Sequence, residues 1–332
     1  MPAVTDSPPL AGAGQVFLFG APLPRDAGDG KKLLGGKGAG LFEMTRLGLP
    51  VPPGLTISTE ACRLYYGAGK TLPPGLWEQV LEGVAALEKL GGKRFGGEPP
   101  LLLSVRSGAR VSMPGMMDTV LNLGLNERAV AALARLSGDE RFALDSYRRF
   151  LAMFAGVVLG APREAFEEAL ARKKKDAGAR LDTELDAKAL RELVESFKAI
   201  AARGGRPVPE DPREQLELAV RAVFDSWFGA RAVTYRRLYG IPEDWGTAVN
   251  VQCMVFGNLG PRSGSGVAFT RDPNGGEARL FGEFLFNAQG EDVVAGVRTP
   301  LPVAALAEKF PRAYAELLRI GKVLEGRYRD MQ

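Results

Sequence analysis

Histidine is absent from all 332 positions of the sequence, and this absence excludes several kinds of chemistry. No imidazole is available as a general base, as a nucleophile or as a carrier of a phosphoryl group. The usual zinc sites are excluded as well, because the only cysteines, Cys62 and Cys253, lie far apart and lack the spacing of metal ligands. We therefore expect two reduced thiols in the core.

A long apolar run and a strong charge excess are also missing. Nowhere do eighteen apolar residues follow one another, and the N-terminus has no charged segment followed by an apolar run, so the sequence predicts a cytoplasmic protein. The 43 basic and 39 acidic residues leave a net charge of +4, which is too small to indicate nucleic-acid binding and is compatible with an anionic small molecule. The apolar fraction of 45% is typical of globular proteins, and the length indicates two or three domains or subdomains.

What the sequence does contain is a segment, 101–126, in which an apolar run of strand character meets a turn rich in Arg, Ser, Gly and Met. Arg106 and Arg110 follow the run, and guanidinium groups beside flexible glycine backbone are typical of a phosphate site. The methionines of the turn are suited to pack on a flat base, and the turn ends in a carboxylate, Asp118, and a hydroxyl, Thr119. The alternative is an ordinary surface turn with solvated arginines.

A second segment, 33–49, surrounds Lys37 with glycines and continues into an amphipathic helix. A glycine loop that leads into a helix N-terminus favours anions, because its N–H groups are unpaired and the helix dipole is positive there. The GxxxxGK[ST] spacing of a P-loop is absent. The alternative is a flexible turn that caps the helix.

The rest of the chain predicts a helical region followed by a second strand-rich region. Helices are expected at 129–136, 142–159, 163–175 and 186–202, separated by short polar breaks, and these indicate an inserted helical subdomain. The run 248–256 has the character of a buried strand, with Gln252 as a polar exception. The glycine-rich run 257–266 predicts either a mobile loop over phosphates or a hairpin, and a strand at 279–286 carries Glu283.

Six motifs resemble those of the pyruvate, phosphate dikinases, namely GGKG, SVRSGARVSMPGMMDT, DSYRRF, WGTAVNVQ, SGSGVAFTRDP and NAQGEDVVAGVRTP. The resemblance implies that family's N-terminal nucleotide-binding domain, an α+β, two-lobed ATP-grasp fold that clamps a nucleotide between its lobes. The implied first lobe comprises 1–126 and 206–247, the helical insertion 127–205 and the second lobe 248–332.

The same resemblance implies roles for single residues. Lys37 and Arg106 would hold phosphates and take part in catalysis. Gly115 and Thr119 would line the nucleotide pocket, and Gln252 would lie at its adenine end. The implied cofactors are ATP and Mg²⁺.

Glu283 and Glu291 are weaker candidates for polar or metal-linked roles, and the metal ligands stay unassigned. The chain departs from the family at Pro261 and Arg262, which stand where the family usually has an acidic residue and a threonine, and this affects the flexibility and charge of the glycine-rich loop. The family's acidic magnesium ligands and last phosphate-binding Gln and Arg would lie beyond Gln332.

In the family, the β-phosphoryl group of ATP passes to a histidine on a central domain and then to pyruvate in a separate barrel. The implied partners are therefore ATP and those two domains, in a homo-oligomeric enzyme, with no nucleic acid and no membrane. The chain alone is expected to be inactive, as an excised fragment or a truncated homologue. Two alternatives stay open: a non-catalytic nucleotide-responsive module, and the ATP-binding domain of a phosphoenolpyruvate synthase-like enzyme.

Overall fold

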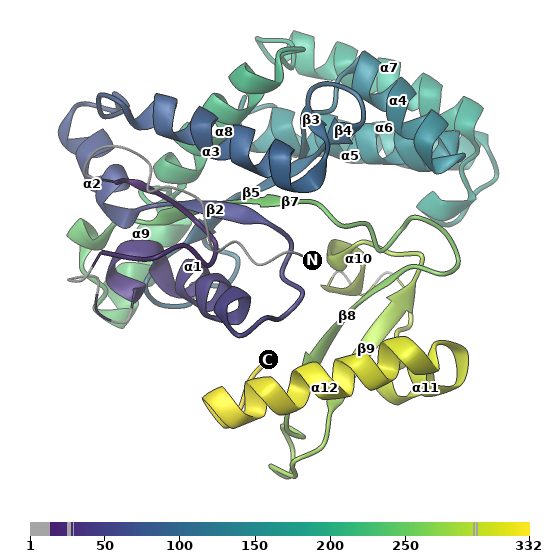
Figure 1. The fold of residues 1–332 in the computed structure, drawn as a ribbon. Coiled ribbons are helices and arrows are strands. Elements are labelled where there is room, and N and C mark those ends of the chain that lie inside the picture. Colours follow the sequence, from purple (N-terminus) through teal and green to yellow (C-terminus); the bar gives the residue numbers. More distant parts are fainter. Residues whose placement is uncertain (1–13, 25–27, 29, 295, 297) are drawn as a thin grey trace. The chain divides into compact units, whose positions relative to one another are not determined.

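The computed structural model describes residues 14–24, 28, 30–294, 296 and 298–332 and divides into a first unit that ends at Met254 and a second that begins at Val255. Both units are α+β (Figure 1). The first unit contains an antiparallel sheet of five strands in the order β1-β2-β7-β5-β6. These strands are β1 (Val16–Leu18), β2 (Gly54–Ile57), β7 (Ala248–Cys253), β5 (Leu103–Gly108) and β6 (Thr119–Leu123).

The two faces of this sheet differ in polarity because side chains alternate along each strand. Leu55, Val105 and Val251 form an apolar face that is fully buried, and the alternate positions carry polar side chains. Helix α1 (Lys31–Arg46) lies on one side of the sheet, and α3 (Leu76–Gly91) and α8 (Pro212–Ser226) lie on the other (Figure 1). The apolar face is the one that meets α3, where a Cβ atom at Gly83 would lie 2.5 Å from the Leu55 side chain.

Several of the described helices begin where the sequence places a capping side chain. Ser58 accepts a hydrogen bond from the backbone N–H of Ala61 at the start of α2 (Thr59–Gly67), as expected for a helix that begins there. Asn126, Asp139 and Asp186 cap three of the four helices of the inserted region in the same way. Those helices are α4 (Glu127–Ser137), α5 (Glu140–Val157), α6 (Arg163–Asp176) and α7 (Ala187–Arg203), close to the ranges predicted from periodicity.

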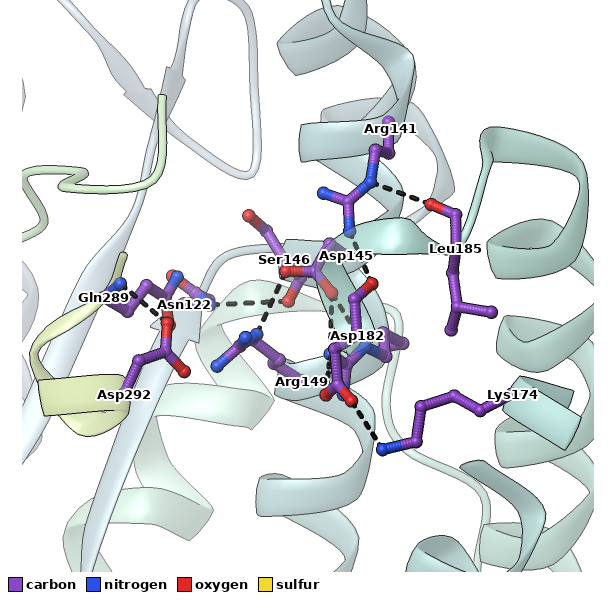
Figure 2. A network of polar contacts seen from close by, with 11 residues as sticks. Asn122, Arg141, Asp145, Ser146, Arg149, Lys174, Asp182, Leu185, Gln289 and Asp292 are labelled. Atoms are coloured by element: carbon purple, nitrogen blue, oxygen red, sulfur yellow. Dashed lines mark hydrogen bonds and ion pairs between the residues drawn. The ribbon is translucent and has the colours of Figure 1, made fainter. Parts of the chain in front are cut away.

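A partly buried ionic network joins α5 to α6 (Figure 2). Arg148 of α5 is buried and lies 2.7 Å from Asp145 and 2.8 Å from Asp182. Lys174 of α6 reaches the second oxygen of Asp182 at 3.0 Å. Burial alone would raise the pKa of Asp145, but the charges of Arg148 and Arg149 lower it. The network therefore fixes α5 against α6 through charges that burial makes costly to separate.

Strand β7 departs from the expected division of the chain. We expected residues 248–332 to form the second lobe, but β7 is the central strand of the first unit's sheet and pairs with β2 and β5. The division follows one residue after Cys253, at Met254. Composition indicated a strand here but not its partners, because the residues that pair, such as Ser104 and Gln252, are 148 positions apart.

The second unit contains an antiparallel sheet in the order β10-β9-β8. Its elements are β8 (Gly264–Phe269), β9 (Phe281–Phe286), α10 (Gly290–Val294), β10 (Leu301–Pro302), α11 (Leu306–Lys309) and α12 (Pro311–Tyr328). Arg271 ties the end of α12 to the sheet, because its guanidinium donates to the carbonyl of Arg329 at 2.9 Å and pairs with Glu325.

The remaining elements of the first unit are α9 (Ala230–Tyr239), two 3-10 turns, η1 (Asp182–Glu184) and η2 (Glu243–Trp245), and the short parallel pair β3 (Arg94–Phe95) and β4 (Pro100–Leu101). Within the described part of the chain, none of the helices combines the length and apolar character that crossing a membrane requires.

Candidate functional site

The polar face of the five-stranded sheet gathers side chains from three neighbouring strands. Arg106 of β5 stands opposite Thr119 of β6 on one side and opposite Asn250 of β7 on the other. Gln252 lies two residues further along β7, so its side chain shares the face of Asn250. Register thus puts Arg106, Thr119 and Gln252, which are far apart in sequence, on one side of one sheet.

Helix α1 approaches this face closely because it carries glycines. Gly35 breaks the helix with φ 67° and ψ 174°, and a Cβ atom there would lie 1.7 Å from the carbonyl oxygen of Gly108. The N–H of Gly36 donates to the carbonyl of Ala109 at 2.8 Å. The expected glycine loop ahead of a helix is therefore a kinked helix that begins at Lys31, and its glycines allow contact with the end of β5.

The third glycine of α1 packs on the sheet itself. A Cβ atom at Gly38 would lie 3.0 Å from both Asn250 Oδ1 and Thr56 Oγ1, which are joined by a hydrogen bond of 2.7 Å. The Nδ2 atom of Asn250 is buried without a partner among the described residues. Asn250 was not singled out from the sequence, although a second polar residue in the run AVNVQC was a visible signal.

This packing brings Lys37 close to Arg106. The pKa of the Lys37 ammonium is lowered from its ordinary value of 10.5, first by desolvation and second by the positive charge of Arg106. Both residues remain exposed, so the pair faces solvent. Two neighbouring cations repel each other, and an anion between them would relieve the repulsion. Such a pair of neighbouring cations favours an anion beside it.

Replacing Lys37 with Met is expected to raise stability at neutral pH slightly, by an amount on the order of 1 °C in melting temperature. Between the lowered pKa and 10.5, the unfolded chain keeps a proton that the folded protein has released, so wild-type stability rises with pH in that window. The stability of Lys37→Met should not rise with pH in this window.

Melting curves of both proteins recorded from pH 7 to pH 10.5 measure how the melting temperature changes with pH. Lys32→Met, which removes a charge from the first turn of the same helix, is the control and should keep the wild-type slope; an unchanged slope in Lys37→Met would contradict the prediction.

The two arginines of the segment 101–126 have different surroundings. The Arg110 guanidinium lies over the ring of Trp245, 5.1 Å from its centroid. The pKa of Glu60 on α2 is lowered chiefly by its hydrogen bond with Arg63, and the charge of Arg110 adds to this shift. Arg106 instead stands on the sheet face beside Lys37. The sequence predicted two guanidinium groups at one site, and the structure gives the two groups different neighbours.

The methionine-rich turn between β5 and β6 is held by a hydrophobic cluster. Met113 is buried with Ala109, Trp227 and Ala232, and Met116 and Met117 pack against the same cluster. Here the thioethers anchor the turn on α8 and α9, so the hypothesis that they pack on a flat base stays a prediction. The turn presents Gly115 at an exposed position with φ 72°, a left-handed conformation that favours glycine.

The end of this turn carries a partly desolvated carboxylate. Desolvation raises the pKa of Asp118, and Arg231 of α9, 3.6 Å away, opposes the shift. Asp118 directly precedes Thr119, the first residue of β6.

Gln252 has a structural partner, because its Nε2 donates to the carbonyl of Pro52 at 3.0 Å. This bond attaches the residues that lead into β2 to strand β7. A role at the adenine end of a nucleotide stays a prediction.

The remaining candidates, Glu283 and Glu291, belong to the second unit. Glu283 is exposed on β9, opposite Val267 of β8, and Glu291 lies in the first turn of α10. Among the residues that the structure describes, no three His, Cys, Asp or Glu side chains gather in a way that could hold a metal ion.

Comparison with known proteins gives a consistent result. The family described as "Pyruvate phosphate dikinase, AMP/ATP-binding domain" matches residues 68–309. The chain is 56% identical over 329 residues to "Pyruvate, phosphate dikinase 1, chloroplastic" of Arabidopsis thaliana, covering 98% of this chain and 34% of that protein. It is 54% identical over 331 residues to "Pyruvate, phosphate dikinase" of Rhizobium meliloti (strain 1021), covering 96% and 37%, and 53% identical over 305 residues to the protein of that name in Clostridium symbiosum, covering 91% and 35%. The chain thus spans about a third of the length of these relatives.

Proposed function

Because this chain belongs to the pyruvate phosphate dikinase AMP/ATP-binding domain family, we propose that it binds ATP on the polar face of its five-stranded sheet. The family resemblance inferred from the motifs is confirmed by this match. The observation that carries the proposed site is the adjacency of Lys37 and Arg106. A triphosphate would place negative charge beside both cations, with the guanidinium fork binding two oxygens and the ammonium acting as a point charge.

The neighbouring residues fit the rest of a nucleotide. Thr119 stands opposite Arg106 and would offer a hydroxyl to the same phosphates, and Gly115 of the turn would line the nucleotide pocket. Gln252 lies further along β7, about 7 Å beyond Asn250. Its bond to Pro52 fixes the amide group, so that Oε1 would accept a hydrogen bond from the adenine amino group.

We also propose that the two α+β units are the lobes of an ATP-grasp fold. The family's Mg²⁺ would be held mainly by the phosphates of ATP with one or two carboxylates, as is usual for this ion. Glu283 and Glu291 stay weaker candidates for that role. The described residues contain no group of three acidic ligands.

The reaction that we propose for the whole enzyme converts ATP, phosphate and pyruvate to AMP, diphosphate and phosphoenolpyruvate. The β-phosphoryl group would pass from ATP to a histidine on another domain and from there to pyruvate, and the γ-phosphoryl group would pass to phosphate. Positioning and charge stabilisation dominate phosphoryl transfer. The part of this chain would be to hold the ATP phosphates with Lys37 and Arg106 while the acceptor histidine approaches.

Replacing Arg106 with Lys is expected to weaken ATP binding about tenfold, which corresponds to about 1.4 kcal/mol, because the positive charge stays but the planar fork is lost. Isothermal titration calorimetry of the purified protein with ATP measures the change. Arg135→Lys, at a surface ion pair with Glu98, is the matched control and should bind ATP as the wild type does. Equal affinity of Arg106→Lys and wild type would remove Arg106 from the phosphate site.

A further inference from the structure

The glycine-rich segment at the start of the second unit is closed on itself by hydrogen bonds. We define it as the glycine loop, residues 257–263, which leads into β8. Its first residue, Gly257, accepts a hydrogen bond from the N–H of Ala288 at 2.9 Å. A Cβ atom at Gly257 would lie 2.1 Å from Ser265 Oγ and 2.3 Å from the Ala288 carbonyl oxygen, so only glycine fits this approach. The sequence predicted a mobile loop or a hairpin, whereas the loop is folded onto the residues that follow β9.

The tip of the glycine loop is held from both sides by one residue, Asn287. Its side-chain Oδ1 accepts a hydrogen bond from the N–H of Gly260 at 3.2 Å. Its backbone N–H donates to the carbonyl of Ser263 at 2.8 Å. These bonds bracket Pro261 and Arg262.

Asn287 is itself fixed in an uncommon conformation. Its φ is 46°, in the left-handed region that Asn and Asp tolerate better than most residues. The guanidinium of Arg298 donates to the carbonyl of Asn287 at 3.1 Å and to the carbonyl of Phe286 at 2.8 Å. Ser265 Oγ donates to the carbonyl of Ala288 at 2.8 Å. Backbone groups on both sides of Asn287 are thus engaged, and its side chain is directed at the loop.

We propose that Asn287 is a positioning residue that clamps the tip of the glycine loop, residues 260–263, in one shape, so that the loop meets ATP preformed. The part that concerns ATP rests on the proposed function. A preformed loop loses less conformational freedom on binding than an open one, and this difference appears directly in affinity. Pro261 acts in the same direction, because its ring fixes φ at the tip.

The clamp can be tested by limited proteolysis, because trypsin cleaves after arginine and Arg262, within residues 260–263, is exposed. Trypsin binds the Arg262–Ser263 bond in an extended conformation, so the hydrogen bond between the Ser263 carbonyl and the N–H of Asn287 must break first. Asn287→Gly keeps the left-handed backbone and removes only the side-chain acceptor. We expect it to speed cleavage at this bond by about threefold to tenfold, the effect of losing one hydrogen bond. Mass spectrometry follows this bond, with cleavage after the exposed Arg180 of the first unit as the internal standard.

Two further variants separate the clamp from a general loss of stability. Asn287→Asp keeps both an acceptor oxygen and the tolerance for the left-handed region, so it should cleave at the wild-type rate. Asn274→Gly makes the same replacement in the hairpin between β8 and β9 of the same unit and should leave the Arg262–Ser263 bond as protected as in the wild type. ATP affinity, measured by calorimetry, should fall about threefold in Asn287→Gly alone.

The outcomes are distinct. Unchanged cleavage in Asn287→Gly, or equally fast cleavage in Asn274→Gly, would overturn the clamp. Faster cleavage with unchanged ATP affinity would overturn its positioning role for ATP. A wild-type protein that binds no ATP would overturn the proposed function, while the cleavage rates would still decide the clamp.

Discussion

Purified protein incubated with ATP, phosphate, pyruvate and magnesium is expected to form no phosphoenolpyruvate, because none of its 332 residues is a histidine. The proposed reaction passes the phosphoryl group through a phosphohistidine on another domain. Lys37 and Arg106 would hold the donor, but aligned donor and acceptor groups are both required for transfer. The expected rate of product formation is therefore the uncatalysed rate.

ATP labelled at the β-phosphate makes this measurement direct. The full-length pyruvate, phosphate dikinase of Clostridium symbiosum, which is 53% identical over 305 residues, is a suitable positive control under the same conditions. Calorimetry on the same preparation shows whether ATP binds, which separates an ATP-binding domain from a protein with no nucleotide site. If this chain alone, with no other protein present, transferred the label to phosphoenolpyruvate, the proposed dependence on another domain would be refuted.

Replacing Gly35 with Ala is expected to destabilise the first unit by about 4 kcal/mol, at the upper end of single-substitution effects. Two causes add up. The backbone at φ 67° and ψ 174° is strained for any residue with a Cβ atom, and that atom would lie 1.7 Å from the Gly108 carbonyl oxygen. Helix α1 would have to move away from β5, and Lys37 would move with it. Any folded protein that remains should bind ATP at least about tenfold more weakly.

Urea unfolding followed by tryptophan fluorescence measures this effect on the first unit alone. All three tryptophans, Trp77, Trp227 and Trp245, precede Met254. Gly36→Ala is the matched control, because a Cβ atom at Gly36 would meet its nearest neighbours at 3.4 Å, an ordinary contact distance. The control should stay near the wild-type midpoint. Equal midpoints for Gly35→Ala and Gly36→Ala would show that α1 does not depend on this close approach.

Local signals in the sequence were sufficient for most helices. A capping side chain predicted the helix start at Ser58, whereas the helices that Asn126 and Asp139 cap begin two residues earlier than the apolar periodicity indicated. The apolar periodicity of the inserted region gave its four helices, because a helix buries one face with a period that can be counted along the chain. Family membership also followed from motifs that can be read in order.

Patterns within a few residues of the sequence did not predict the tertiary contacts of residues that are close in sequence. Arg106 and Arg110 are four positions apart and looked equivalent, but Arg110 lies over Trp245 while Arg106 stands beside Lys37. Asn250 was passed over because its importance comes from its contacts with Thr56 and Gly38, which no local pattern encodes. The roles of Gly115, Thr119 and Gln252 stay predictions for the same reason, since a ligand contact is a property of the assembled site.

The sequence by itself determined the family, the helices and the kinds of charged groups available, because propensity, capping and composition act within a few residues. Only the tertiary structure decided that Lys37 and Arg106 form a pair, since that depends on the register of β5 with β6 and β7 and on the close approach of α1 at Gly35. It also decided that β7 belongs to the first unit and that the glycine loop closes on Asn287. These features arise from hydrogen bonds and packing between segments that are distant in sequence, and such contacts form only when the chain folds.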